Sequence, residues 1–587
     1  MTAIQPASIS FATWLDRGVI VAVVLASMVA MSVNLADPDL WGHVQYGRDA
    51  LASGLPATTT YSYVAQDYPW INHEILAELG LAAVNDAFGG VGLLVMKALL
   101  GLCVILLIGR AAQKQGAGVV TASALMLLVA AALGRHWLLR PQLISYVSFA
   151  LLLALLNWCF AGWAGTWQLR WPGRARVEDS TLTYDSRRMR YLWLVPVLMM
   201  AWTNSHGGFL AGLCVYIAYM GLRGIEAYCQ RGRDSFGLLR RFALMATVAV
   251  LATFINPYGY RFHQWLYHDL HVPRPEILEW RRPDLLDPYT LPFLLLGGLW
   301  LATLAFSRRP KDFTQTAVLA LIGWQAIEHH RHMAFFAIAA GFWLGGPLQS
   351  LLERLGAGSA DISLADSLSR RGRVGLALGL VAAIAICGVQ CVRKLSALQV
   401  DRSTFPVAAI DYVAQQGLQG RMVVTFNWAQ YALAAIGARD AGQNGVRIHV
   451  DGRCRTSYSQ AMLDEHFDFI LGPPDPAMRY RDPASGPYDP NRALQHGMPD
   501  LALVSRAQAP SVETLERQNG AWILLYQDSL AQLWGRASRY GDPASPDYIP
   551  VERRSITDAP QTGHARWPAL PDYRPRPRAT SGSLVQR

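Results

Sequence analysis

The first two thirds of the chain alternate between long apolar runs and short polar segments, and the last third is mixed. A helix that crosses a bilayer needs about 20 mostly apolar residues, because its backbone polar groups must be satisfied within the span. The pattern therefore predicts a polytopic α-helical membrane protein with about eleven transmembrane helices. These are expected at residues 18–36, 91–109, 117–134, 142–160, 191–204, 207–224, 242–256, 290–306, 313–328, 333–347 and 374–391. A further short helix at the membrane surface is expected at 75–87.

From Arg393 onward the pattern is that of a globular domain. A helical period covers 405–417, and apolar segments typical of strands occupy 422–426, 446–451 and 522–526. These elements predict an α/β domain.

The domain organisation follows from these patterns. We expect a transmembrane domain at 1–392 with a large first outside loop at 37–90, followed by the α/β domain at 393–538. Residues 539–587 are rich in Pro, Arg and Ser and poor in aliphatic residues, which predicts a disordered tail.

Composition agrees with a membrane protein. Of the 587 residues, 52% are hydrophobic and only 16% are charged, against about 25% charged in soluble proteins. The net charge of +10 comes mostly from short loops and an Arg-rich tail. That distribution is typical of topology signals and argues against a nucleic-acid partner.

Arginine-rich loops predict the orientation. Four of them, within 170–190, 231–241, 308–311 and 354–373, fall on the same side as the N-terminus when the spans are counted. Positive loops stay in the cytoplasm. We therefore expect a multi-pass protein of the bacterial inner membrane with a cytoplasmic N-terminus and an extracytoplasmic C-terminal domain.

Histidines and polar motifs gather on the predicted outer side. All 14 histidines fall in outside loops, near outside helix ends or in the C-terminal domain. Two explanations are equally good. Cytoplasmic loops select Arg and so leave His elsewhere, or the histidines form a functional polar surface at the outer face of the membrane.

The first outside loop holds the strongest candidates for chemistry. Asp37 and Asp39 bracket a proline directly after the first span, and Trp41 and His43 follow as candidate substrate-binding residues. The carboxylates are candidates for a general base acting on an acceptor hydroxyl, or for ligands of a divalent cation, magnesium or manganese. Termination of the helix by Asp and Pro is the structural alternative. Further along, His73 and Glu74 are candidates for orienting a phosphate or a sugar hydroxyl, or for part of a helix cap.

Arginines in the outside turns run against the positive-inside bias, so they need a cause. Arginine bonds two phosphate oxygens at once, which makes a lipid phosphate head group a candidate ligand. The alternative is that the side chains anchor the helices at the interface. The candidates are Arg135, Arg140, Arg261, Arg281 and Arg331.

Two further features carry weaker signals. His329 and His332, next to Glu328, are spaced for a metal site on one helical face, but no H-E-x-x-H signature accompanies them. Lys97 is a lone charge within the second span and either contacts a donor phosphate or lines a cavity.

Taken in order along the chain, these motifs resemble the GT-C superfamily of membrane glycosyltransferases, in particular a bacterial branch with D-x-D-L-W-x-H after the first helix. The resembling segments are Asp37 to His43, Pro69-Trp70-x-x-His73-Glu74, Arg140-Pro141-Gln142, Asn204-Ser205-His206-Gly207, Asn256-Pro257-Tyr258-Gly259, Glu279-Trp280, Phe405-Pro406-x-Ala408-Ala409, Phe426-Asn427-Trp428-x-x-Tyr431 and Val450-Asp451-Gly452-Arg453. Gly42 stands where related chains often have a second Trp, a difference expected to widen the pocket.

The resemblance implies a glycosyltransferase that moves a sugar from a polyprenyl-phosphate-linked donor to a glycan, lipid or protein acceptor of the cell envelope. It implies that Asp37 or Asp39 is the base or a metal ligand, and that Asn204, His206 and Glu279 join the substrate-binding residues. A flippase for lipid-linked glycans and a scaffold for polysaccharide assembly are the alternatives. A flippase would need polar groups through the whole membrane depth, which the sequence does not show.

Overall fold

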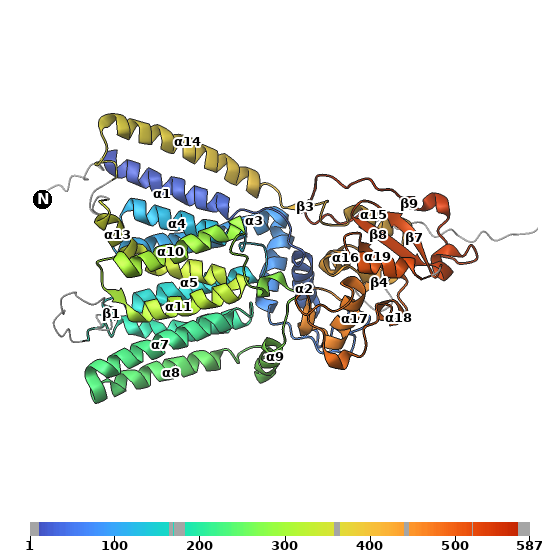
Figure 1. Ribbon diagram of the computed structural model, residues 1–587, viewed down its shortest axis with the longest axis horizontal. Coiled ribbons are helices and arrows are strands. Elements are labelled where there is room, and N and C mark those ends of the chain that lie inside the picture. The colour runs from blue at the N-terminus through green and yellow to red at the C-terminus, as the bar shows by residue number, and fades with distance from the viewer. Residues whose placement is uncertain are drawn as a thin grey trace, which may run out of the picture. The chain divides into compact units, whose positions relative to one another are not determined.

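The computed structural model describes residues 11–163, 168–169, 182–356, 364–438, 445–518 and 520–572. The chain forms two compact units. The helical unit comprises Met1–Asn34 and His73–Leu398, and the C-terminal unit comprises Leu35–Asn72 and Gln399–Arg587. Figure 1 shows the helices of the first unit and the strands of the second.

The helical unit is built from long apolar helices and short connecting elements. The long helices are α1 (Phe11–Ala30), α3 (Ile75–Lys114), α4 (Val119–Leu133), α5 (Gln142–Cys159), α7 (Phe209–Arg231), α8 (Phe236–Ala252), α10 (Leu291–Phe306), α11 (Phe313–Glu328) and α14 (Arg370–Leu395). The shorter ones are α6 (Leu194–Thr203), α9 (Tyr260–Leu270), α12 (Met333–Trp343) and α13 (Gly345–Arg354). Five 3₁₀ segments join them: η1 (Arg188–Trp193), η2 (Gly232–Ser235), η3 (Leu278–Trp280), η4 (Pro288–Thr290) and η5 (His330–His332). Strands β1 (Gln168–Leu169) and β2 (Lys311–Asp312) pair antiparallel.

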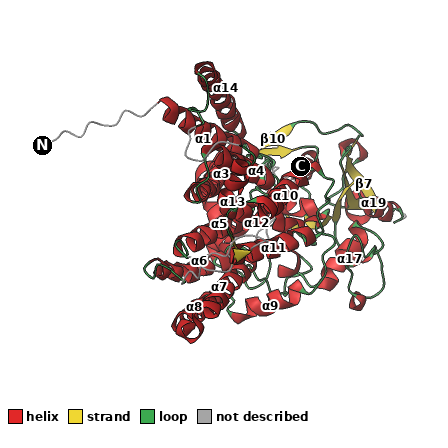
Figure 2. Cartoon of the chain, turned by 60° about the vertical axis from the view of Figure 1, so that its left-hand side comes forward, coloured by secondary structure: helices red, strands yellow, loops and turns green. Residues whose placement is uncertain are grey.

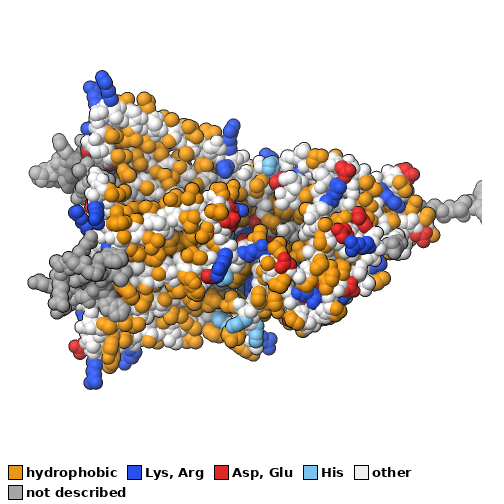
Figure 3. Space-filling view, in the orientation of Figure 1, with side chains coloured by type: hydrophobic (Ala, Val, Ile, Leu, Met, Phe, Trp, Pro, Cys, Tyr) orange, Lys and Arg blue, Asp and Glu red, His pale blue; other side chains and the backbone are white. Residues whose placement is uncertain are grey.

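The packing of these helices follows their sequences. All eleven residues of α12 are buried, as expected of an apolar helix inside a bundle. By contrast, α14 has no buried residue and exposes large aliphatic side chains, as expected of a lipid-facing helix. Hydrophobic side chains cover most of the visible surface of this unit, and Lys and Arg gather at one end of it (Figure 3).

The prediction of a polytopic helical membrane protein is confirmed. All eleven apolar segments fall largely on helix, and Gly89, with φ +62°, interrupts α3 between the predicted segments at 75–87 and 91–109. Six helices of the described chain are long and apolar enough to cross a membrane. A seventh is added if α12 and α13, bent by 64°, form one span. The number of eleven crossings therefore stays a prediction.

The C-terminal unit contains a six-stranded mixed sheet with the order β5-β4-β6-β8-β7-β9. The strands are β4 (Gly420–Val424), β5 (Val446–Ile448), β6 (Leu501–Ser505), β7 (Trp522–Gln527), β8 (Ala531–Arg536) and β9 (Ser555–Ile556). A separate pair joins β3 (Gln399–Asp401) to β10 (His564–Arg566). The helices are α2 (Leu40–Ser53), α15 (Val407–Gln416), α16 (Ala429–Ile436), α17 (Gln460–Ile470), α18 (Arg492–Gln495) and α19 (Ala509–Glu516). Most of the strands that Figure 2 draws belong to this unit.

Both faces of the central strands are buried. Along β4, Met422 and Val424 join one hydrophobic core and Val423 joins another. The side chains of β6 also alternate between these two cores, because successive side chains of a strand point to opposite faces. The α/β class is thus confirmed, with predicted strands recovered at β4, β5 and β7. Strands β6 and β8 were not predicted.

Two domain boundaries differ from those expected. Residues Leu35–Asn72, predicted as a loop of the transmembrane domain, belong to the C-terminal unit, because Trp41, Tyr46, Tyr61 and Trp70 are part of its core. The prediction of disorder from 539 is wrong as far as 572. That segment contains β9, which pairs with β7, and β10, which pairs with β3. Residues 573–587 lie outside the described residues.

Candidate functional site

In the helical unit, the ends of α3 and α6 bring several candidates together. The backbone N–H of Leu76 donates to the carbonyl of Asn204 over 2.9 Å. The side-chain amide of Asn204 donates to the carbonyls of Met200 and Ile255, each over 2.8 Å. Asn204 therefore connects the ends of three helices, a structural role that the sequence did not predict.

His206 is held in one orientation by two contacts of its Nδ1. Its Nδ1 lies 2.7 Å from the hydroxyl of Ser145 and accepts the backbone N–H of Gly208 over 3.0 Å. The Ser145 hydroxyl in turn accepts the indole N–H of Trp202 over 2.7 Å. Because Nδ1 accepts from Gly208, the ring proton of neutral His206 is assigned to Nε2.

Glu74 lies beside two imidazoles. Its carboxylate is 3.7 Å from Nε2 of His206 and 3.8 Å from Nε2 of His73. The ring of His73 is stacked on Phe262, with centroids 5.5 Å apart. His73, Glu74 and His206, predicted separately from two motifs, thus form one cluster in which the His206 proton is directed toward a carboxylate.

A second cluster contains Arg331. Its guanidinium lies over the ring of Trp280, with Cζ 4.6 Å from the ring centroid, and Arg274 lies 4.5 Å from the same centroid. Arg274 is paired with Asp269, and Arg140 is paired with Glu279 over 2.9 Å. Burial lowers the pKa of Arg331, and the neighbouring Glu279 opposes this shift. Among the described residues Arg331 has no hydrogen bond and no ion pair, so a partly buried cation is left for an anionic ligand.

The remaining arginine candidates are placed differently. Arg135 forms an ion pair with Asp287 over 2.8 Å and lies over the ring of Tyr289. Arg281 donates to the carbonyl of Pro275, and Arg261 is exposed at the start of α9. Their placement gives no support to phosphate binding beyond that available from the sequence.

Histidines near these arginines are neutral at physiological pH. Burial, together with His330, whose ring centroid is 4.8 Å away, lowers the pKa of His136 to about 3. Burial likewise lowers the pKa of His332 to about 4. They therefore add hydrogen-bonding groups and no charge.

Residues 328–332 are not arranged as a metal site in this structure. The Glu328 carboxylate binds Arg282 through both oxygens, and Nδ1 of His329 donates to the carbonyl of Trp280 over 2.9 Å. The rings of His329 and His332 have centroids 5.8 Å apart. In the described part of the chain these residues belong to no group of three converging ligand atoms. Lys97 is buried in α3 and donates to the carbonyl of Val33.

In the C-terminal unit, Asp37 and Asp39 stand at the start of α2. A side-chain oxygen of Asp37 accepts the backbone N–H of Asp39 over 3.0 Å, and the Asp37 carbonyl accepts the N–H of Leu40 over 3.1 Å. Asp39 is the N-cap residue of α2, and His43 lies one turn into the helix. Asp37 and Asp39 therefore do start a helix, as the structural alternative predicted. This role does not exclude a general base or a metal ligand at the same carboxylates.

The carboxylate of Asp39 occupies the space that a side chain at Gly452 would fill. A Cβ on Gly452 would lie 2.6 Å from Oδ1 of Asp39 and 2.7 Å from Nε2 of Gln430. A Cβ on Gly42 would lie 2.3 Å from Oε1 of the same Gln430. The space that Gly42 was expected to add to a pocket is thus filled by Gln430, and the D-G-R segment fixes the surroundings of Asp39.

Trp41 is a core residue rather than a surface contact. It is 2% exposed, and its ring lies 4.8 Å from each of the rings of Phe405, Tyr431 and Trp567. Its indole N–H donates to the carbonyl of Pro568 over 2.9 Å. These contacts give no support to a substrate-binding role for Trp41.

Arg453 also connects the 35–72 segment to the rest of this unit. It forms a fork-to-fork pair with Asp451, and its Cζ lies within 4.6 to 5.8 Å of four ring centroids, those of Trp70, Tyr46, Tyr61 and Tyr458. The sequence motif around Arg453 was recognised, but its partners were not. The aromatic residues at 46, 61 and 70 were the available signal.

No protein-family model and no curated protein sequence matches the chain. Solved structures with a similar fold were found. ArnT from Cupriavidus metallidurans bound to undecaprenyl phosphate is 15% identical, with a TM-score of 0.50 over 92% of this chain and 99% of ArnT. The oligosaccharyltransferase AglB from Archaeoglobus fulgidus, in complex with an inhibitory peptide and a dolichol-phosphate, is 9% identical, with a TM-score of 0.51 over 84% of this chain and 69% of AglB. The chain has the GT-C fold. At these identities the likeness establishes the fold and leaves the reaction to be argued from the residues.

Proposed function

We propose that the protein is a glycosyltransferase that takes a sugar from a polyprenyl-phosphate-linked donor. The observation that carries the proposal is Arg331, a partly buried cation over Trp280 with no hydrogen bond or ion pair among the described residues, in a chain with the GT-C fold. A fixed guanidinium binds phosphate oxygens in a forked geometry. The lipid phosphates bound by ArnT and AglB support the choice of lipid phosphate as ligand.

In the proposed reaction, Asp37 or Asp39 accepts the proton of an acceptor hydroxyl. The hydroxyl oxygen forms a bond to the anomeric carbon, and the bond from that carbon to the donor phosphate oxygen breaks with its electron pair. Arg331 stabilises the negative charge on the departing lipid phosphate. Glu74 and His206 orient donor hydroxyls or phosphate oxygens, since Nε2 of His206 is assigned the proton that can be donated.

The donor set at Asp37 and Asp39 fits a hard cation only in part. Neither residue belongs to a group of three converging ligand residues in the described chain. Magnesium is often held by one or two carboxylates together with substrate phosphates, so two aspartates suffice if a phosphate is present. A bound Mg²⁺ or Mn²⁺ would neutralise phosphate charge.

We also propose that the C-terminal unit lies outside the cytoplasm and that the acceptor is a glycan, lipid or protein of the cell envelope. The Arg-rich loops support this orientation through the positive-inside rule. Cysteine labelling in intact cells tests it, with one cysteine introduced in the C-terminal unit and another in the 231–241 loop.

The central experiment follows consumption of donor. Purified full-length protein in nanodiscs is incubated with radiolabelled polyprenyl-phosphate sugars and an envelope fraction as acceptor. The wild-type protein should consume one of the donors, and the double variant Asp37→Asn/Asp39→Asn should not. Undiminished consumption by the double variant would rule out the role of the aspartates. A wild-type protein that binds donor and never consumes it would support the flippase or scaffold alternative.

A further inference from the structure

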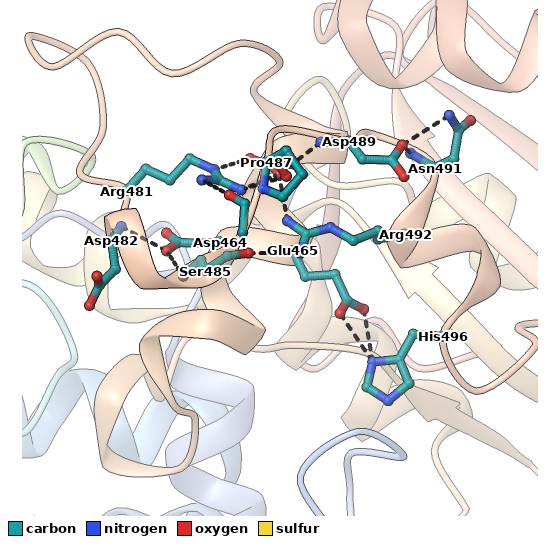
Figure 4. A network of polar contacts seen from close by, with 12 residues as sticks. Asp464, Glu465, Arg481, Asp482, Ser485, Pro487, Asp489, Asn491, Arg492 and His496 are labelled. Atoms are coloured by element: carbon teal, nitrogen blue, oxygen red, sulfur yellow. Dashed lines mark hydrogen bonds and ion pairs between the residues drawn. The ribbon is translucent and has the colours of Figure 1, made fainter.

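A cluster of imidazole and carboxylate groups lies in the C-terminal unit and uses none of the residues proposed for sugar transfer. His449 follows β5, Glu465 lies on α17, and His496 follows α18. Nε2 of His449 is 3.0 Å from Oε1 of Glu465, and Nδ1 of His496 is 3.0 Å from the same oxygen. One ligand atom from each residue lies within 4.8 Å of the other two. In Figure 4 the carboxylate of Glu465 points toward the ring of His496.

The spacing of these atoms fits a small tetrahedral ion. Zinc bonds to nitrogen and oxygen ligands are about 2.0–2.1 Å long, so two ligand atoms of a tetrahedral site lie roughly 3.3 Å apart. The two distances of 3.0 Å at Glu465 are close to this value. Two imidazoles with one carboxylate are a ligand set for zinc, whereas magnesium and calcium prefer oxygen ligands throughout.

An ion can reach the cluster from solvent. His496 is half-exposed, which gives an ion a route from solvent.

The hydrogen bonds among His449, Glu465 and His496 leave nearby buried imidazole nitrogens without a partner in the described chain. His466 is fully buried, its ring stacks on His449 with centroids 5.3 Å apart, and neither of its nitrogens has a hydrogen-bond partner in the described chain. Nδ1 of His449 is also buried and has no hydrogen-bond partner in the described chain. A buried ring nitrogen without a partner costs about 1–3 kcal/mol, so such a cluster usually serves a ligand or an ordered water.

We propose that His449, Glu465 and His496 bind one zinc ion that fastens residues 471–500 onto α17. Ion pairs already hold other parts of this segment, since Asp468 on α17 pairs with Arg479, Arg481 and Arg492. The ion fixes the end of the segment at His496, directly before β6 enters the sheet. A metal bound only in the folded state adds its binding free energy to stability.

The test uses untagged full-length protein in detergent, stripped with a chelator and then titrated with Zn²⁺ alone. We expect one tightly bound zinc per chain by mass spectrometry of metals, retained in the presence of excess Mg²⁺. Replacing one ligand should weaken the affinity at least about tenfold. His496→Ala is the primary variant because the side chain is half-exposed and folding should tolerate its loss, and Glu465→Gln is the second. His564→Ala, at an exposed histidine on β10, is the matched control.

Thermal unfolding and hydrogen exchange give a readout independent of sugar transfer. Zinc should raise the melting temperature of the stripped wild-type protein and slow exchange in peptides covering 490–500, and it should do neither in His496→Ala. The inference is overturned if the wild-type protein retains no zinc, or if His496→Ala binds zinc as tightly as the control. Either result leaves the proposed sugar transfer untouched, because different residues carry it.

Discussion

The carboxylate of Asp39 lies directly against Gly452, at a distance that leaves no room for a side chain there. A Cβ on Gly452 would lie 2.6 Å from Oδ1 of Asp39, which no real Cβ contact tolerates. Asp39 comes from the first loop and Gly452 from the segment after β5, over 400 residues later. The glycine therefore fixes where this carboxylate can be.

Gly452→Ala should displace Asp39 and reduce sugar transfer. The added methyl group forces the side-chain ends of Asp39 and Gln430 to move, at a small cost in stability because both side chains can rotate away. A shift of about 1 Å in a catalytic group lowers rates by roughly 10²-fold, so transfer should fall much more than stability. The measurement is donor consumption by variants matched in folded fraction.

Two controls separate Asp39 from general damage. Gly80→Ala, on α3, adds a methyl group where no atom lies within 4 Å, and it should leave transfer unchanged. Adding Gln430→Ser to Gly452→Ala relieves the contact with Gln430 and not the contact with Asp39, so activity should stay low. Full recovery in that double variant would show that Gln430, and not Asp39, is what the alanine disturbs.

The single variants Asp37→Asn and Asp39→Asn should differ strongly in activity. Asparagine at 37 can still accept the backbone N–H of Asp39, so the turn that starts α2 is retained and only the charge is lost. Loss of a general base lowers the rate by about 10²–10⁴-fold. One variant should show that loss and the other should retain most of the activity. Activity retained in both would contradict a catalytic carboxylate at this position.

Arg331→Gln should weaken binding of the lipid phosphate. A hydrogen bond to a charged group contributes about 1.5–3 kcal/mol, so the affinity for undecaprenyl phosphate alone should fall roughly 10- to 100-fold. Arg282→Gln is the matched control, because Arg282 is 74% exposed and already paired with Glu328, three residues before Arg331 in the sequence. Equal affinity in the two variants would remove Arg331 from the proposed phosphate site.

The sequence predicted those elements that depend on neighbouring residues, and it missed those that depend on residues far away in the chain. Lipid imposes long apolar runs, so the helices were readable from local pattern, and β4, β5 and β7 were readable as buried strands. Strand β8 was missed because its Gln532 and Gly535 interrupt the apolar pattern. The tail at 539–572 was misjudged because its order depends on distant parts of the chain. Strand β10 pairs with β3, over 160 residues earlier, and Ala565 packs against the core of the unit.

The candidate site was predictable as a set of residue types and not as roles. The turns between helices were singled out for their His, Glu and Arg residues, and the structure brings His73, Glu74 and His206 of these turns together. Whether an Arg is paired depends on a partner far away in the sequence, as with Arg140 and Glu279. The burial of Trp41 depends on Phe405, Tyr431 and Trp567, which only the folded chain brings together.

Ser145→Ala should destabilise the helical unit around His206. The variant leaves the buried indole N–H of Trp202 without its acceptor and removes a partner of Nδ1 of His206. An unsatisfied buried donor costs about 1–3 kcal/mol. Ser123→Ala is the matched control, on α4, where the buried hydroxyl has no hydrogen-bond partner in the described chain. Faster hydrogen exchange in residues 200–210 is expected for the first variant alone. Equal exchange in both variants would mean that Ser145 does not hold Trp202 and His206 in place.

Asp468→Asn should destabilise the C-terminal unit and flatten its dependence on pH. Burial raises the pKa of Asp468, but hydrogen bonds from Arg481, Arg479 and Arg492 outweigh it and lower the pKa below its ordinary value. The ionised form is thus favoured by the fold. Its stabilising contribution is complete above the ordinary pKa of about 4 and is lost as the pH falls through the lower pKa of the folded state.

At neutral pH the substitution leaves three arginines without their shared carboxylate, one of them, Arg479, fully buried. Removing one partner of a buried ion pair costs about 3–5 kcal/mol. Hydrogen exchange of peptides covering α17, followed between pH 3 and 7, measures the effect, with Glu513→Gln as the control because its pair with Arg517 is exposed. The wild-type protein should lose protection below about pH 4, and the Asn variant should start low and change less. Parallel pH profiles for the two proteins would mean that Asp468 does not carry the acid sensitivity.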